Sequence, residues 1–152
     1  MKPRLTVIFL VTLALGITFA QVNHPYTIGR PGTLNWQPGD IFPGTDMALI
    51  AGDPHHPGDF TMRIRTSGAS HVNPYSYPDF ENITVLNGNL YVGFGPTVSA
   101  AGEETLPIGG FISINPGTVH YWRTDAGTVL QFHGNGCLQP IFLNAPAPPP
   151  CV

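Results

Sequence analysis

Lysine is nearly absent from this sequence, since the only one is Lys2, close to the N-terminus. Chemistry that needs a lysine Schiff base is therefore excluded for the rest of the chain. Positive charge of any kind is scarce, with 6 lysines and arginines against 9 carboxylates and a formal net charge of −3. Because binding to nucleic-acid phosphates depends on clustered basic residues, we expect no nucleic-acid partner.

Cysteine is equally rare, and only Cys137 and Cys151 occur. In an oxidising compartment such a pair persists as a disulfide. We expect the two cysteines to be joined, which would fix the Pro-rich C-terminal tail to the body of the protein. Two free thiols are the alternative.

Helical periodicity is missing from everything after Ala20, and the chain is punctuated by 18 glycines and 17 prolines. Between these turn signals lie short runs of β-branched and aromatic residues. Phe60, Met62 and Ile64 alternate with polar residues, and this period of two is typical of a strand with one buried face. Further strands are expected at residues 47–51, 83–86, 90–94, 111–114, 119–122, 128–132 and 141–143. The pattern predicts an all-β fold, and Asn87-Gly88 predicts a two-residue hairpin between its flanking strands.

The N-terminus has the form of an export signal. Lys2 and Arg4 precede an apolar run from Leu5 to Ala20, which ends in Thr18-Phe19-Ala20 with small residues before the expected cleavage point. A membrane anchor is the alternative, but the run is shorter than the ~20 apolar residues that a bilayer requires. We therefore expect a secreted or periplasmic protein with no stable membrane anchor after cleavage.

The length of 152 residues suits a single hydrophobic core. We divide the chain into a signal peptide at 1–20, a Pro/Gly-rich arm at 21–57 that packs on the barrel, a β-barrel at 58–144 and a Pro-rich tail at 145–152.

Two stretches carry information beyond strand propensity. Residues 74–88 read PYSYPDFENITVLNG, and residues 110–120 read GFISINPGTVH. Together they resemble the two cupin motifs, and a looser resemblance extends from about residue 52 to 144. The second motif is matched in full, at Gly110, Pro116, Gly117 and His120. The resemblance implies a double-stranded β-helix, or jelly-roll barrel.

The first motif departs from the cupin pattern at its two histidine positions, which hold Tyr75 and Tyr77 here, although Glu81 is kept. In cupins two imidazoles and the carboxylate of this motif, with the imidazole of the second, hold a divalent metal such as iron, manganese, zinc or nickel. The resemblance thus leaves Glu81 and His120 as ligands. A phenol with an unperturbed pKa of ~10 is a poor ligand unless a cation such as Fe³⁺ deprotonates it.

Two histidines could replace the missing ligands. His71 stands just before the first motif, and His133 closes the strand after the second. Strand alternation places His133 on one face with Gln131 and Val129, and we expect that face to point inward. Without a metal, Glu81 and His120 would form a buried carboxylate–imidazole pair, which is either an acid–base dyad or a remnant of a metal site.

We expect aromatic residues around the barrel mouth, where they suit a small organic or sugar-like ligand. They are Tyr75, Tyr77, Tyr91, Phe94, Tyr121 and Trp122. The expected binding pocket consists of Tyr75, Tyr77, Glu81, His120, Gln131 and His133.

The favoured interpretation is an exported cupin-domain protein that binds a small organic ligand in its barrel without the usual metal centre. A metal-dependent enzyme, oxygenase or isomerase-like, with a substituted ligand set is the main alternative, and a metal-free acid–base enzyme is a third. The sequence leaves open whether the protein is an enzyme and whether a divalent metal or Fe³⁺ is its cofactor. A homodimer is a further expectation, because cupins often pair through edge strands.

Overall fold

The computed structural model describes residues 26–146 and 148–149, so the expected signal peptide at 1–20 and Cys151 lie outside the described residues. The described chain is built almost entirely of short strands, with two single-turn 3-10 helices, η1 (Pro31–Thr33) and η2 (Ala100–Gly102). None of its helices is long and apolar enough to cross a membrane.

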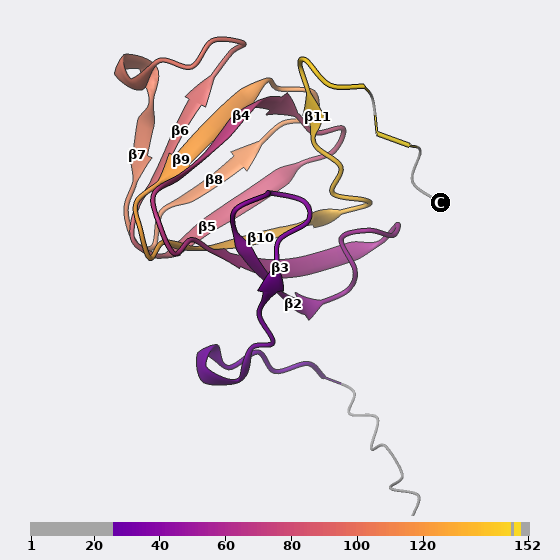
Figure 1. The fold of residues 1–152 in the computed structure, drawn as a ribbon. Helices are drawn as coiled ribbons and strands as arrows, with labels where there is room; N and C mark the ends of the chain where they lie inside the picture. The colour runs from indigo at the N-terminus through magenta and orange to yellow at the C-terminus, as the bar shows by residue number, and fades with distance from the viewer. Residues whose placement is uncertain (1–25, 147, 150–152) are drawn as a thin grey trace, which may run out of the picture.

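The strands form two antiparallel sheets that face each other as the layers of a barrel (Figure 1). The six-stranded sheet has the order β1 (Gln37–Pro38), β2 (Asp46–Ala51), β3 (Asp59–Arg65), β10 (Val129–Asn135), β5 (Glu81–Asn87) and β8 (Phe111–Ile114). The five-stranded sheet has the order β11 (Ile141–Phe142), β4 (Ser70–Ser76), β9 (His120–Thr124), β6 (Leu90–Phe94) and β7 (Glu104–Leu106). The all-β jelly-roll prediction is confirmed.

The core lies between the two sheets and follows from strand alternation. Phe60, Met62 and Ile64 of β3 are at most 4% exposed, whereas the polar residues between them face outward. From β10, Leu130 and Phe132 enter the same core, each about 1% exposed. Burial of such apolar side chains is the main source of stability in a barrel of this size.

The predicted hairpin at Asn87-Gly88 is wrong in its pairing. Gly88 does make a turn, with φ of +73°, but β5 and β6 on either side of it belong to different sheets. The turn packs on the loop before β10 instead, because the Asn87 side chain donates a 2.8 Å hydrogen bond to the carbonyl oxygen of Gly127. The apolar inner faces of the two strands, Ile83 and Val85 in β5 and Leu90 and Val92 in β6, enter the core from the two different sheets.

The strand β4 has no clear sequence signal because Pro74 interrupts it. Its register against β9 shifts between Val72 and Tyr75, and such an irregularity accommodates a residue without a backbone N–H. Beyond the shift, Tyr75 is the register partner of His120. A proline-induced irregularity therefore sets which side chain of the first motif meets the second motif.

The N-terminal arm takes part in the barrel. Its strand β2 pairs with β3, so the sheet extends before the barrel boundary that we expected at Gly58. Phe42, from the turn before β2, is only 1% exposed and enters the core.

Close packing between β6 and β9 gives a direct test of this arrangement. A Cβ atom added to Gly93 would overlap the phenol ring of Tyr121 on the paired strand. We expect Gly93→Ala to lower the free energy of unfolding by about 1–3 kcal/mol, as measured by chemical denaturation. Gly68→Ala is the matched control, because a Cβ there meets nothing within 4 Å. It should change stability by less than about 0.5 kcal/mol, and equal effects of the two substitutions would contradict the close approach of β6 to Tyr121.

Candidate functional site

The polar residues of the two motifs meet inside the barrel, between the sheets. Tyr75 and His120 come from the paired strands β4 and β9, and Glu81 reaches them from β5 in the opposite sheet. Tyr75 and His120 are 0% exposed and Glu81 is 2% exposed. The structure thus brings together three of the six residues that were expected to form one pocket.

Tyr75 holds the centre of this group through its hydroxyl. It donates a hydrogen bond of 2.8 Å to Glu81 Oε1 and accepts one of 3.1 Å from the indole Nε1–H of Trp122. Burial raises the pKa of Tyr75 well above its ordinary value, and the negative charge of Glu81 raises it further. The phenol is therefore a fixed neutral donor that satisfies one oxygen of a buried carboxylate.

His120 faces the other oxygen of Glu81. Its Nδ1 lies 3.0 Å from the carbonyl oxygen of Thr118, and since a carbonyl only accepts, Nδ1 carries a proton and donates it there. Nε2 then lies 3.1 Å from Glu81 Oε2, but the two atoms are not aligned as a hydrogen bond, and within the described part of the chain neither has another hydrogen-bond partner. An unprotonated imidazole nitrogen and a carboxylate oxygen would oppose their lone pairs, so a proton on one of them is needed to make this contact attractive.

Aromatic rings close the polar group off from water. The rings of Tyr75 and His120 lie 4.2 Å apart. Phe42 from the arm lies 5.8 Å from Tyr75, and Phe142 of β11 lies 5.6 Å from it. Sequence reasoning placed neither phenylalanine at the site: Phe42 sits in a short Pro-flanked segment without periodicity, and Phe142 lies in the expected strand 141–143 but outside both motifs.

The described residues do not fit a resident metal ion. Glu81 Oε2 and His120 Nε2 lie 3.1 Å apart and could both ligate an ion, but among residues 26–146 and 148–149 no group of three or more His, Cys, Asp or Glu side chains could hold one. The Tyr75 hydroxyl is already engaged by Glu81 and by Trp122, so in this arrangement it is not turned toward those two atoms as a third ligand. We therefore derive no chemistry through a metal.

Tyr77 is committed elsewhere in the structure. It is 3% exposed, and its hydroxyl donates a 2.8 Å hydrogen bond to the carbonyl oxygen of Asn135. Burial, with smaller contributions from Asp79 and Glu81, raises the pKa of Tyr77 to about 12. Both tyrosines of the first motif are thus hydrogen-bonded structural residues.

The prediction that His133 and Gln131 face the barrel interior is wrong. In β10 the buried positions are Leu130 and Phe132, so the alternation carries Gln131 and His133 to the outer face. There Gln131 Oε1 accepts a 3.1 Å hydrogen bond from Arg63, and His133 stacks with Phe111 at 6.4 Å. Both alternating faces of β10 carry apolar residues, so alternation alone does not decide which one points inward. The face with Leu130 and the large ring of Phe132 is the buried one.

His71 does not supply a ligand either, since it is an exposed residue of β4 that pairs in register with Arg123.

The expected ring of aromatics at the mouth is also incomplete. Tyr91 lies on the outside of the five-stranded sheet, where the guanidinium carbon of Arg123 is 3.8 Å from the centroid of the Tyr91 ring. Trp122 is 0% exposed and belongs to the core.

The expected disulfide stays a prediction, because Cys151 lies outside the described residues. Cys137 is 6% exposed, and its sulfur lies 3.1 Å from the carbonyl oxygen of His55 in the arm.

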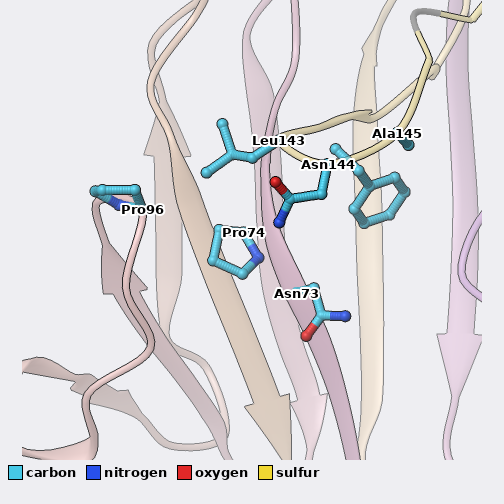
Figure 2. A pocket seen from close by; sticks show the side chains of 7 residues that line it. Asn73, Pro74, Pro96, Leu143, Asn144 and Ala145 are labelled. Atoms are coloured by element: carbon cyan, nitrogen blue, oxygen red, sulfur yellow. The ribbon is translucent and has the colours of Figure 1, made fainter.

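A cavity of about 400 Å³ opens at the surface beside the closed site. It lies between β4, the turn after β6 and the segment that follows β11, and Figure 2 shows its side chains around one hollow. The residues that line it are Asn73, Pro74, Pro96, Phe142, Leu143, Asn144 and Ala145. Phe142 lines this cavity, and its ring centroid lies 5.6 Å from that of Tyr75; we call the hollow the mouth cavity.

Comparison with known proteins identifies the fold. No protein-family model matches the chain, and no curated protein matches it in sequence. Among solved structures, an RmlC-like cupin from Shewanella frigidimarina is similar over 72% of this chain and 89% of its own, with a TM-score of 0.57 and 12% identity. KdgF from Halomonas is similar over 73% of this chain and 92% of its own, with a TM-score of 0.55 and 15% identity.

The polyketide cyclase RemF from Streptomyces resistomycificus gives a TM-score of 0.59 at 14% identity, over 80% of this chain and 87% of its own. The chain therefore has the cupin fold. Identities this low carry the fold and no activity, because unrelated functions share it.

The buried tyrosines predict a pH dependence of stability. Above pH ~10 the unfolded chain loses its tyrosine protons, whereas folded Tyr75 and Tyr77 keep theirs. The folded state then binds more protons than the unfolded state, so the free energy of unfolding falls as pH rises from 10 towards 12. Each of the two tyrosines adds about 1.4 kcal/mol per pH unit to this slope.

Denaturation curves measured at several values of pH test this prediction. Tyr75→Phe should be less stable at neutral pH, because it leaves Glu81 Oε1 and Trp122 Nε1 without their partner. The free energy of unfolding of Tyr75→Phe should also fall less steeply with pH above 10, because the contribution of one tyrosine to that slope is lost. A slope identical to that of the wild type would contradict the protonated, buried state of Tyr75.

Proposed function

We propose that this chain is an exported binding protein with a cupin fold, which holds a small neutral polar molecule in the mouth cavity without a metal centre. The single observation that carries the proposal is the contrast between a closed interior and an open, uncharged mouth. Export rests on the signal-like segment Lys2–Ala20 of the sequence.

The closed interior argues for binding rather than catalysis. Glu81 and His120 are nearly inaccessible, and Phe42 and Phe142 pack against the tyrosine that joins them. Phe142 lines the mouth cavity, whereas neither Glu81 nor His120 does. General acid–base catalysis requires hydrogen-bond reach to the substrate, so we assign the pair a structural role.

The lining of the mouth cavity indicates the kind of ligand. None of its seven residues is charged. Asn73 and Asn144 are exposed, and no hydrogen bond of either side-chain amide occurs within the described residues. Each amide offers two donors and an acceptor. Figure 2 shows the Asn144 amide turned toward Pro74, so polar groups and apolar rings share one hollow.

This combination suits a neutral polyol or sugar-like molecule. Its hydroxyl groups would pair with the two amides, and its C–H faces would pack on Pro74, Pro96 and Leu143. A volume of about 400 Å³ lies within the range of small-molecule sites, which begins at roughly 300 Å³.

Chemical-shift mapping tests this proposal. We would titrate the ¹⁵N-labelled protein with a panel of neutral monosaccharides and polyols and with the corresponding uronic acids. A neutral member should shift the amide signals of Asn73, Leu143 and Asn144 in a saturable way. Asn144→Leu should weaken that binding at least tenfold, because a buried polar contact is lost.

Asn115→Leu serves as the control, since Asn115 is an exposed asparagine that does not line the cavity. It should leave the affinity unchanged. The proposal is wrong if no neutral member of the panel binds, or if binding survives Asn73→Leu and Asn144→Leu together.

A further inference from the structure

A second hollow lies on the outer face of the six-stranded sheet. It has a volume of about 360 Å³ and lies between the arm segment 31–36 and strands β3, β5 and β10. Its walls include Leu34, Trp36, Arg63, Arg65, Leu86 and Val129. We call it the arm groove, and it shares no lining residue with the mouth cavity.

Two guanidinium groups line the arm groove, and one of them is neutralised. Arg65 Nε lies 2.9 Å from Asp46 Oδ2, and its guanidinium carbon lies 4.5 Å above the ring of Trp36. Its charge is therefore balanced, and its position is fixed by the strand pairing that places Asp46 opposite Arg65. Arg65 and Trp36 together form one wall of the groove.

Arg63 is the guanidinium without a carboxylate. Its Nε–H donates a 3.1 Å hydrogen bond to the neutral side chain of Gln131, and within the described residues it takes part in no ion pair. Gln131 is the register partner of Arg63, so the side chain is oriented from the sheet itself. The two terminal nitrogens remain for a further acceptor. In a chain of net charge −3, this leaves one local positive charge without its counterpart.

The chemistry of these walls specifies the ligand. A planar guanidinium fork matches the two oxygens of a carboxylate in a bidentate pair, which is stronger and more directional than a single hydrogen bond. One uncompensated charge favours a monoanion. Trp36, Leu34, Leu86 and Val129 offer an apolar surface that suits a flat ring.

We propose that the arm groove is a second binding site of this protein, which takes a small aromatic monocarboxylate with its carboxylate on Arg63 and its ring against Trp36. The arm groove shares no lining residue with the mouth cavity, so either binding proposal can be disproved without affecting the other.

Calorimetry and tryptophan fluorescence on the purified protein test this site, with benzoate and indole-3-acetate as probes and benzamide as the neutral isostere of benzoate. The carboxylates should bind and change the emission of Trp36, because the other tryptophan, Trp122, is fully buried. Benzamide should bind at least tenfold more weakly. Arg63→Gln should weaken the binding of benzoate at least tenfold. Arg63→Lys keeps the charge but loses the planar guanidinium, so its affinity for benzoate should lie between those of the wild type and Arg63→Gln.

Arg123→Gln is the matched control, because it removes the same charge from the opposite sheet, at a half-exposed arginine outside the groove. It should change benzoate affinity by less than twofold. Equal affinity for benzoate and benzamide would overturn the proposal, and this comparison needs no variant. Unchanged binding in Arg63→Gln, or an equal loss in Arg123→Gln, would overturn it as well.

Discussion

The hydrogen bond from Tyr75 to Glu81 links the two sheets through the interior of the barrel, and the rest of the buried site depends on it. A carboxylate that is 2% exposed is costly to bury unless its oxygens are satisfied. Tyr75 satisfies one oxygen at 2.8 Å and is itself held by Trp122, while His120 faces the other oxygen at 3.1 Å. Phe42 and Phe142 then exclude the water that would otherwise solvate this group.

This constraint also determines where the protein can bind something. A neutral histidine in place of Tyr75 would have a ring nitrogen with a free lone pair, whereas the phenol uses its O–H to donate a hydrogen bond to Glu81. Tyr75 therefore cross-links the two sheets through Glu81. Two of the accessible hollows are the uncharged mouth cavity, which Phe142 lines, and the arm groove on the outer sheet face, where no carboxylate of the described residues pairs with Arg63. Their different chemistry is the reason we assign them different ligands.

The sequence predicted the cupin fold and the strands with strong alternation, such as β3, because burial of one face fixes their period. It also indicated that Glu81 and His120 would meet. It could not assign the inner face of β10, where both alternating sets contain apolar residues, nor the sheet to which β6 belongs, since a turn signal does not specify pairing. The burial of Phe42 was not predicted, because it depends on the path of the whole arm, which local sequence does not encode.

The metal content of the purified protein is the most direct measurement of the central claim, that Tyr75 and Glu81 form a hydrogen-bonded cross-link inside the barrel that leaves no place for a metal ion. The protein would be incubated in turn with iron, manganese, nickel and zinc salts, desalted, and analysed by elemental mass spectrometry. Tyr75→His, which restores one imidazole of the cupin pattern, would be treated in parallel. Our account predicts far less than one metal ion per wild-type chain under every condition. Near-stoichiometric metal that survives desalting and is lost in His120→Ala would contradict it.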